Sequence, residues 1–216
     1  MPFSRADAEM EMNRPHRRVF AFTLIELLVV IVIVAVLMGL AFPVFQGVMN
    51  SAKKTQAKND VTQIVTAVNA FYTEYGQYPC TAQSGTDSAD FISNDDAKRQ
   101  ALFDNLRVPI PSAPPATNPR AIAFLQVPAV KNDTAGQRKA GVGSNGVFYD
   151  PWGQPYAVKI DNNYNATVAN VYDANTGAGP GTLNVGVIAW SLGKDQIGGT
   201  GNKGSAGSKD DVISWQ

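Results

Sequence analysis

The sequence of 216 residues predicts an α+β protein in which one long N-terminal helix packs on a small antiparallel sheet. Two patterns predict the helix: a nearly unbroken apolar run over residues 22–42, and apolar side chains that then recur every three or four residues up to Tyr75. Short apolar stretches between turn residues predict the sheet, within residues 147–216. We therefore expect the form of a ladle, with the helix as its handle and the sheet as its bowl.

The composition limits the function. Lys+Arg and Asp+Glu both total 18, so no charge excess favours nucleic acid as a partner. The single cysteine, Cys80, cannot form a disulfide within the chain. The single histidine, His16, precedes the apolar run, so the rest of the chain cannot build a Ser-His-Asp, Cys-His or histidine-containing zinc site. We expect a protein that is not an enzyme and does not bind nucleic acid.

Residues 22–46 are expected to cross a membrane once. About 20 apolar residues in a helix span the hydrocarbon of a bilayer, and the apolar run is long enough. Arginines just before the run favour a cytoplasmic N-terminus, although the lysines that follow it weaken this argument. A cleaved secretory signal is the alternative, but its apolar core is usually about 7–15 residues long and ends at a small-residue cleavage site.

The helix is expected to continue over residues 47–79. Pro43 should kink it, because proline lacks the backbone donor and clashes with the preceding turn. Gly76 and Pro79 should end it. The second half carries one apolar stripe, which the sheet is expected to cover. The stripe consists of Val61, Ile64, Val65, Val68, Phe71, Tyr72 and Tyr75.

The segment AFTLIELLVVIVIVAVLMGLAFP, residues 21–43, resembles the N-terminus of type IV pilins and of type II secretion pseudopilins. The resemblance implies that residues 1–21 are a cytoplasmic leader. A prepilin peptidase would cut between Ala21 and Phe22 and methylate the new amine of Phe22. Glu26 then becomes the fifth mature residue, where the family has its glutamate. Ala21 departs from the glycine that the family has before the cut.

Glu26 is an acid within the apolar run, and a carboxylate in hydrocarbon costs about 2.5–3.5 kcal/mol on insertion scales. In a filament, the Phe22 amine of a neighbouring subunit could pair with this carboxylate and recover much of the cost. Phe22, Glu26 and Pro43 are thus the expected assembly residues. The alternative is that Glu26 extends to the membrane interface near the start of the run.

Residues 80–146 are expected to form a variable connecting region. Within it, residues 95–107 predict a short surface helix, with Ser93, Asn94 or Asp95 as its N-cap. Residues 119–126 predict a second short helix. Residues 141–146 match G-x-G-x-x-G, but the flanking sequence predicts neither the strand before it nor the helix after it that a dinucleotide site needs.

The C-terminal region, residues 147–216, predicts short strands at 147–149, 156–160, 166–172 and 185–191, and a type I turn at 150–153. The stretch DPWGQPY, residues 150–156, resembles a segment of the major pseudopilin of type II secretion systems. So do SLGKD, residues 191–195, and DDVISW, residues 210–215, with the glycine-rich loop between them.

In the major pseudopilin that last loop binds calcium, so the resemblance implies a Ca²⁺ site here. Its ligands would be the carboxylates of Asp195, Asp210 and Asp211 and the backbone carbonyls of Leu192 and Ile197. Calcium takes six to eight oxygen ligands of these types. The sequence departs from the family in a longer loop and at position 196, where glutamine replaces the usual glycine. A solvated loop without an ion is the alternative.

The resemblance implies a structural subunit of a helical homo-oligomeric filament, the periplasmic pseudopilus that drives type II protein secretion. Expected partners are the prepilin peptidase, an inner-membrane assembly platform and minor pseudopilins. The expected location is the bacterial inner membrane, with a single pass, a cytoplasmic N-terminus and a periplasmic C-terminal part. The alternative is a surface type IV pilus subunit for adhesion, motility or DNA uptake. Such pilins usually close a C-terminal loop with a disulfide, which Cys80 alone cannot form.

Overall fold

The computed structural model describes residues 22–80, 91–93, 95–107, 117–172, 177–197 and 209–216, and of residues 40–44 and Phe91 it describes the backbone alone. The predicted leader, with Ala21, lies outside these residues. The protein is α+β, as the sequence predicts. It divides into two compact units, Met1–Gly47 and Val48–Gln216.

Helix α1 extends over Leu24–Tyr75, a length of 52 residues, and confirms the predicted long helix. The helix continues through Pro43. Gly76 ends it with a left-handed backbone, φ 68°, and its N–H donates to the Tyr72 carbonyl at 2.8 Å. This single bond is the αL type of helix end, which favours glycine because a Cβ disfavours positive φ.

In the first unit, every described residue of α1 from Leu24 to Gly39 is exposed. The large apolar side chains range from 43% exposed at Val34 to 86% at Leu24. Within the part of the chain that the structure describes, no helix combines the length and the hydropathy needed to cross a membrane.

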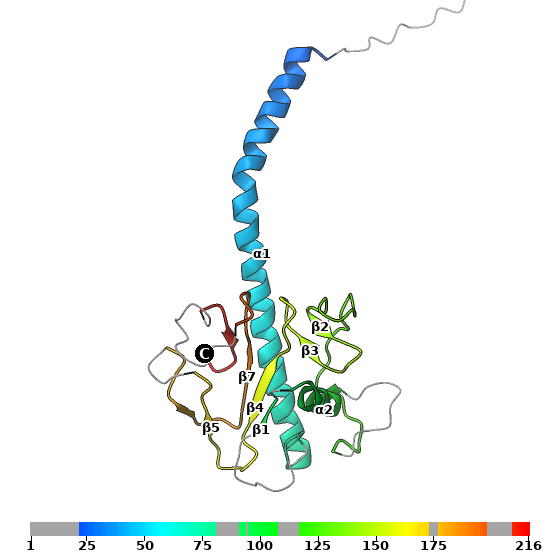
Figure 1. The fold of residues 1–216 in the computed structure, drawn as a ribbon, viewed down its shortest axis with the longest axis vertical. Helices are drawn as coiled ribbons and strands as arrows, with labels where there is room; N and C mark the ends of the chain where they lie inside the picture. The colour runs from blue at the N-terminus through cyan, green and yellow to red at the C-terminus, as the bar shows by residue number, and fades with distance from the viewer. Residues whose placement is uncertain (1–21, 81–90, 94, 108–116, 173–176, 198–208) are drawn as a thin grey trace, which may run out of the picture. The chain divides into compact units, whose positions relative to one another are not determined.

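The second unit contains a four-stranded antiparallel sheet with the strand order β1-β4-β7-β8 (Figure 1). Its strands are β1 (Phe91–Ile92), β4 (Ala157–Ile160), β7 (Val187–Ser191) and β8 (Val212–Ile213). The predicted strands at 156–160 and 185–191 are thus the central pair, with Val158 opposite Ala189. The two outer strands were not predicted, and β1 comes from the connecting region.

Two small antiparallel pairs accompany this sheet. Strand β2 (Gly141–Val142) pairs with β3 (Phe148–Tyr149), and β5 (Val168–Ala169) pairs with β6 (Thr182–Leu183). The predicted strands at 147–149 and 166–172 are therefore present in shortened form, outside the main sheet. The G-x-G-x-x-G segment connects β2 to β3 as a hairpin and does not lead into a helix.

Helix α2 (Asp96–Arg107) confirms the first predicted short helix, and Asp95 caps it by accepting the Lys98 N–H at 2.8 Å. The second predicted helix, at 119–126, is wrong. The buried Asn118 side chain accepts the Ile122 N–H at 3.1 Å and donates to the Ile122 carbonyl at 2.8 Å. Such side-chain bonds compete with helical ones and hold the segment in an irregular turn.

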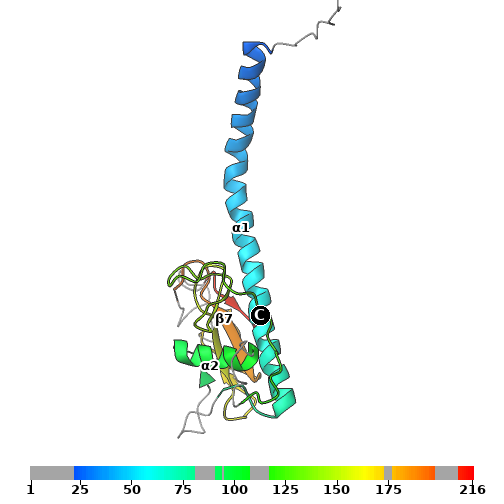
Figure 2. The same cartoon turned by 90° about the vertical axis from the view of Figure 1, so that its right-hand side faces the viewer.

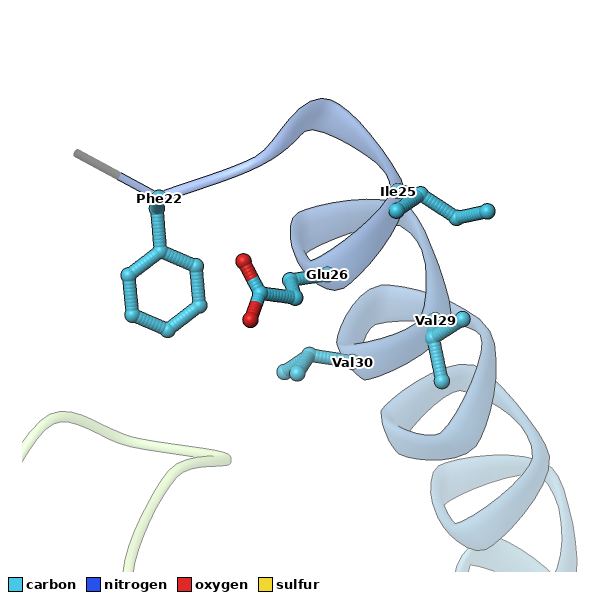
Figure 3. A pocket seen from close by; sticks show the side chains of 5 residues that line it. All are labelled: Phe22, Ile25, Glu26, Val29 and Val30. Carbon is cyan, nitrogen blue, oxygen red and sulfur yellow. The ribbon is translucent and has the colours of Figure 1, made fainter.

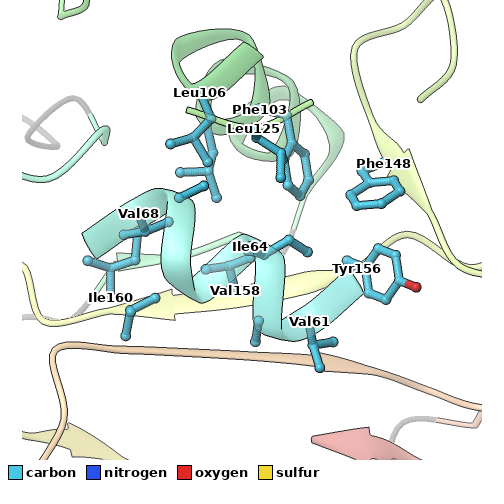
Figure 4. Close-up of a cluster of buried hydrophobic side chains, with 14 of the residues drawn as sticks. Val61, Ile64, Val68, Phe103, Leu106, Leu125, Phe148, Tyr156, Val158 and Ile160 are labelled. Atoms are coloured by element: carbon cyan, nitrogen blue, oxygen red, sulfur yellow. The ribbon is translucent and has the colours of Figure 1, made fainter. Parts of the chain in front are cut away.

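One hydrophobic core joins α1, α2 and the sheet (Figure 4), and Figure 2 shows the sheet alongside the C-terminal half of α1. From the predicted stripe, Val61, Ile64, Val68 and Phe71 are fully buried. Tyr72 is 39% exposed instead and stacks on Tyr78, with 4.7 Å between ring centroids. The core residues facing α1 include Leu102, Phe103, Leu106, Phe148, Tyr156, Val158 and Ile160.

Candidate functional site

Thr23 and Glu26 cap the first turn of α1 by exchanging hydrogen bonds. Glu26 Oε2 accepts the Thr23 N–H at 2.9 Å and the Thr23 hydroxyl at 2.6 Å, and the Glu26 N–H donates back to Thr23 Oγ1 at 3.2 Å. This arrangement is a capping box, which satisfies backbone donors that the helix itself leaves unpaired. The spacing Thr-x-x-Glu is a sequence signal for this capping box, whereas the predicted assembly role of Glu26 rests on its charge.

Glu26 also lines an open pocket of about 410 Å³ at the start of α1, together with Phe22, Ile25, Val29 and Val30. Figure 3 shows the Phe22 ring and the Val30 side chain on the same side of the helix as the Glu26 carboxylate. Phe22 is 76% exposed. Both bonds from Thr23 end on Oε2, and neither neutralises the negative charge. The pocket therefore suits a partner that is apolar and carries a positive charge.

Residues 16–42 match the family model of the prokaryotic N-terminal methylation motif. The N-terminus of this chain is type IV pilin-like. The matched residues include Ala21, Phe22 and Glu26 and end just before Pro43.

The chain is also 33% identical over 69 residues to the type IV major pilin protein PilA of Myxococcus xanthus, strain DK1622. This similarity covers 32% of the chain and 31% of PilA, so the chain spans about a third of the length of this curated relative. No solved structure matches the chain. The comparisons thus concern the N-terminal methylation motif and a limited stretch of one pilin.

A second candidate site lies in the C-terminal part, where Asp195, Asp210 and Asp211 come together. One carboxylate oxygen from each lies within 4.8 Å of the other two. Oxygens on opposite sides of one calcium ion are about 4.6–5.2 Å apart, because each bond measures about 2.3–2.6 Å. The three predicted carboxylates are therefore close enough to share one ion. Leu192 and Ile197, the other predicted ligands, flank Asp195, and residues 198–208 lie outside the described part.

Backbone N–H groups hold Asp195 and Asp210 in place. The N–H groups of Lys194 and Asp195 both donate to Asp210 Oδ2, the second at 3.0 Å. The Ile197 N–H donates to Asp195 Oδ1 at 3.0 Å. Gly193 has φ 70°, and a Cβ at this position would lie 2.5 Å from the Asp210 carbonyl oxygen. The turn thus depends on a residue without a side chain.

Asp211 is the buried member of the cluster, and Tyr172 supports it. The Tyr172 hydroxyl donates to Asp211 Oδ2 at 2.5 Å. Burial, together with this carboxylate, raises the pKa of Tyr172, so the hydroxyl keeps its proton and remains a donor.

Gln196 stands where the resemblance predicts glycine, and its backbone adopts the left-handed conformation, φ 61°. Two hydrogen bonds of its side chain offset the free-energy cost of this backbone conformation. Its Nε2 donates to the Trp152 carbonyl at 3.1 Å, and its Oε1 accepts from Gln154 Nε2 at 2.8 Å. These bonds connect the acidic loop to the predicted turn at 150–153, in which the Gly153 N–H donates to the Asp150 carbonyl at 3.1 Å.

Proposed function

We propose that the chain is a structural subunit of a pseudopilus, the filament of type II protein secretion. The observation that carries this proposal is the methylation motif over residues 16–42, followed by a helix whose apolar side chains are exposed. A helix that is apolar on all sides is normally buried in a membrane or inside an assembly. Residues 22–46 would lie in the bacterial inner membrane before assembly and in the filament core afterwards.

Processing would precede assembly. A prepilin peptidase would cut between Ala21 and Phe22 on the cytoplasmic side and methylate the Phe22 amine. The C-terminal unit would lie in the periplasm. The partners would be further copies of this chain, minor pseudopilins and an inner-membrane assembly platform, consistent with a protein that has no catalytic role.

Glu26 would change partners on assembly. In the free subunit the Thr23 bonds hold its carboxylate, but they leave its charge unbalanced. In the filament, the Phe22 amine of a neighbouring subunit would supply the opposite charge. Pairing opposite charges in a medium of low dielectric constant recovers desolvation cost that neutral hydrogen bonds cannot recover. The capping box would therefore orient the carboxylate, and the neighbouring amine would drive assembly.

Glu26→Gln separates these two roles, because glutamine also suits this position of a capping box. We expect the variant to insert and to be processed, but to form few or no filaments by electron microscopy. Thr23→Val is the matched control: it removes the capping hydroxyl, costs about 0.5–2 kcal/mol of helix stability, and keeps the charge. It should still form filaments. Normal filaments from Glu26→Gln would overturn the proposed pairing.

A surface type IV pilus subunit is the second candidate function, because the curated relative is a type IV major pilin. The DPWGQPY and SLGKD segments and the single cysteine favour the pseudopilus. Deleting the gene in its host distinguishes the two. Loss of secreted proteins from the medium with surface filaments intact would support the pseudopilus, whereas loss of surface filaments with secretion intact would support the pilus.

We also propose that the C-terminal loop binds Ca²⁺ through Asp195, Asp210 and Asp211, with the Leu192 and Ile197 carbonyls. The support is the approach of three carboxylate oxygens to within 4.8 Å of one another, combined with the hard oxygen ligands that calcium prefers. An ion held at both ends of the loop would stabilise the folded unit. A ligand at 100 times its Kd adds about 2.7 kcal/mol.

Thermal unfolding of the processed full chain in detergent tests this site. Millimolar calcium should raise the Tm. Magnesium at the same concentration should raise the Tm less, because Mg²⁺ is a smaller ion that requires a stricter coordination geometry. Asp210→Asn should abolish most of the calcium effect. An unchanged Tm of the wild type at millimolar calcium would contradict the proposal.

A further inference from the structure

Two buried carboxylates interact with one tyrosine side chain in the core of the second unit. Asp60 of α1 is 9% exposed, and Asp150 and Tyr156 are fully buried. The Tyr156 hydroxyl donates to Asp60 Oδ2 at 2.7 Å, which connects α1 to the residue just before β4. Asp150 lies close enough that its negative charge acts on both Asp60 and Tyr156.

Among the described residues, the Asp150 carboxylate accepts more hydrogen bonds than the Asp60 carboxylate. Asp150 Oδ1 accepts the N–H groups of residues 152, 153 and 154 at 2.9, 2.7 and 2.9 Å, and its Oδ2 accepts the Ser191 hydroxyl at 2.6 Å. Asp60 accepts the Tyr156 hydroxyl. Hydrogen bonds to a carboxylate stabilise its charged form and oppose the effect of burial, which raises the pKa of Asp150. At Asp60 the Tyr156 hydroxyl is the donor that opposes the effect of burial in the same way.

No ion pair between described residues includes Asp60 or Asp150. On α1 itself, the nearest lysine in sequence is Lys58, whose ammonium group donates to the Ile213 and Gln216 carbonyls. The titratable groups facing Asp60 from the turn and from the start of β4 are Asp150 and Tyr156. Burial, with the charge of Asp150 in addition, raises the pKa of Asp60 above its ordinary value.

We propose that Asp60 is a pH-responsive latch between α1 and the sheet, and that the second unit gains stability when this carboxyl takes up a proton. Protonation removes the cost of burying the charge and the repulsion from Asp150, while the contact with Tyr156 can persist. An acid with a raised pKa binds its proton in the folded state at a pH where the unfolded chain has released it. The free energy of unfolding therefore rises as the pH falls from the raised value toward about 3.9, the ordinary pKa of aspartate.

The proposed pH response of Asp60 does not depend on the proposed function, but it would be useful to a subunit with that function. A subunit on the outer side of the inner membrane meets the external pH. The latch would keep α1 and the sheet together as those surroundings become acidic.

The test compares thermal unfolding of the full chain in detergent between pH 4 and pH 7 for wild type and Asp60→Asn. The variant keeps an acceptor for Tyr156 and loses the charge. We expect it to unfold at a higher temperature than wild type at pH 7, and the difference to close as the pH approaches about 4. Asp96→Asn, an exposed change on α2, is the control and should leave the profile parallel to wild type. Parallel profiles for wild type and Asp60→Asn would overturn the proposal.

A direct titration keeps the proposal testable even if Asp60→Asn fails to fold. Carbon-13 NMR of the wild-type chain should give a titration midpoint for the Asp60 carboxyl above about 3.9. In Tyr156→Phe the midpoint should rise further, because the donor to the charged form is lost. A wild-type midpoint at or below the ordinary value would also overturn the latch.

Discussion

Glu26 and Gly193 show how single residues determine the two candidate sites. Glu26 satisfies the start of α1 through Thr23 and still presents a charge in an apolar pocket. Gly193 allows the turn after β7 to approach Asp210 more closely than any side chain would permit. Each residue has a structural task, and each lies at a site for which a function is proposed.

Gly193→Ala should destabilise the second unit and displace Asp210. The backbone at this position has φ 70°, and a Cβ would meet the Asp210 backbone at 2.5 Å. We expect the left-handed conformation alone to cost about 1–3 kcal/mol, with the steric clash in addition. Gly136→Ala is the matched control, since Gly136 has φ 78° and open space around its Cα. Equal losses of Tm in the two variants would contradict the predicted clash.

Cys80 should be unreactive in the folded protein. Its thiol is half-buried, and burial raises its pKa to about 12, so almost no thiolate is present near pH 8. A thiol reagent at pH 8 should therefore label the native protein slowly and the denatured protein rapidly, as measured by mass. Rapid labelling of the native protein would show that the thiol is accessible and ionised.

Sequence patterns can predict part of this detail. The spacing of Thr23 and Glu26 is a readable signal for a capping box. The left-handed backbone of Gln196 is not readable, because its compensation comes from Trp152 and Gln154, more than 40 positions away. The pairing of Asp60 with Tyr156 depends on tertiary contacts in the same way.

At the scale of elements, the second half of α1 contributes its buried face to the core of the second unit. Phe71 is fully buried and lies 4.7 Å from Tyr75 and 5.3 Å from Phe124, measured between ring centroids. Phe71→Ala should lower the free energy of unfolding by about 3–5 kcal/mol. Thermal unfolding measures this loss. Tyr72→Ala, one position along and 39% exposed, is the control and should cost clearly less. A similar loss in both variants would contradict the assignment of the buried face.

The two helices and the central strands were predictable, whereas the outer strands of the main sheet and the irregular segment at 119–126 were not. The repeat of apolar residues over many turns predicts α1, and Gly76 predicts its end. Strands β1 and β8 are two residues long, which is too short for an alternating pattern. Residues 119–126 have a helix-like composition, but the buried Asn118 side chain takes the backbone bonds that a helix would need.

At the scale of the whole molecule, the two compact units have different requirements. The second unit, Val48–Gln216, has its own core, in which α1, α2 and the sheet meet. The described side chains of the first unit are exposed, so this apolar part of α1 needs surroundings that the described part of the chain does not supply. A membrane before assembly and neighbouring subunits after it would meet this need in turn.

Processing at Phe22 is the step on which the filament account depends. Without a free amine at Phe22, the charge of Glu26 has no matching group on a neighbouring copy. Mass spectrometry of the native protein, purified from membranes or filaments of its host, measures this most directly. We predict a chain that begins at Phe22 and carries one added methyl group on its amine. A mature chain that still begins at Met1, or at any residue other than Phe22, would contradict the account.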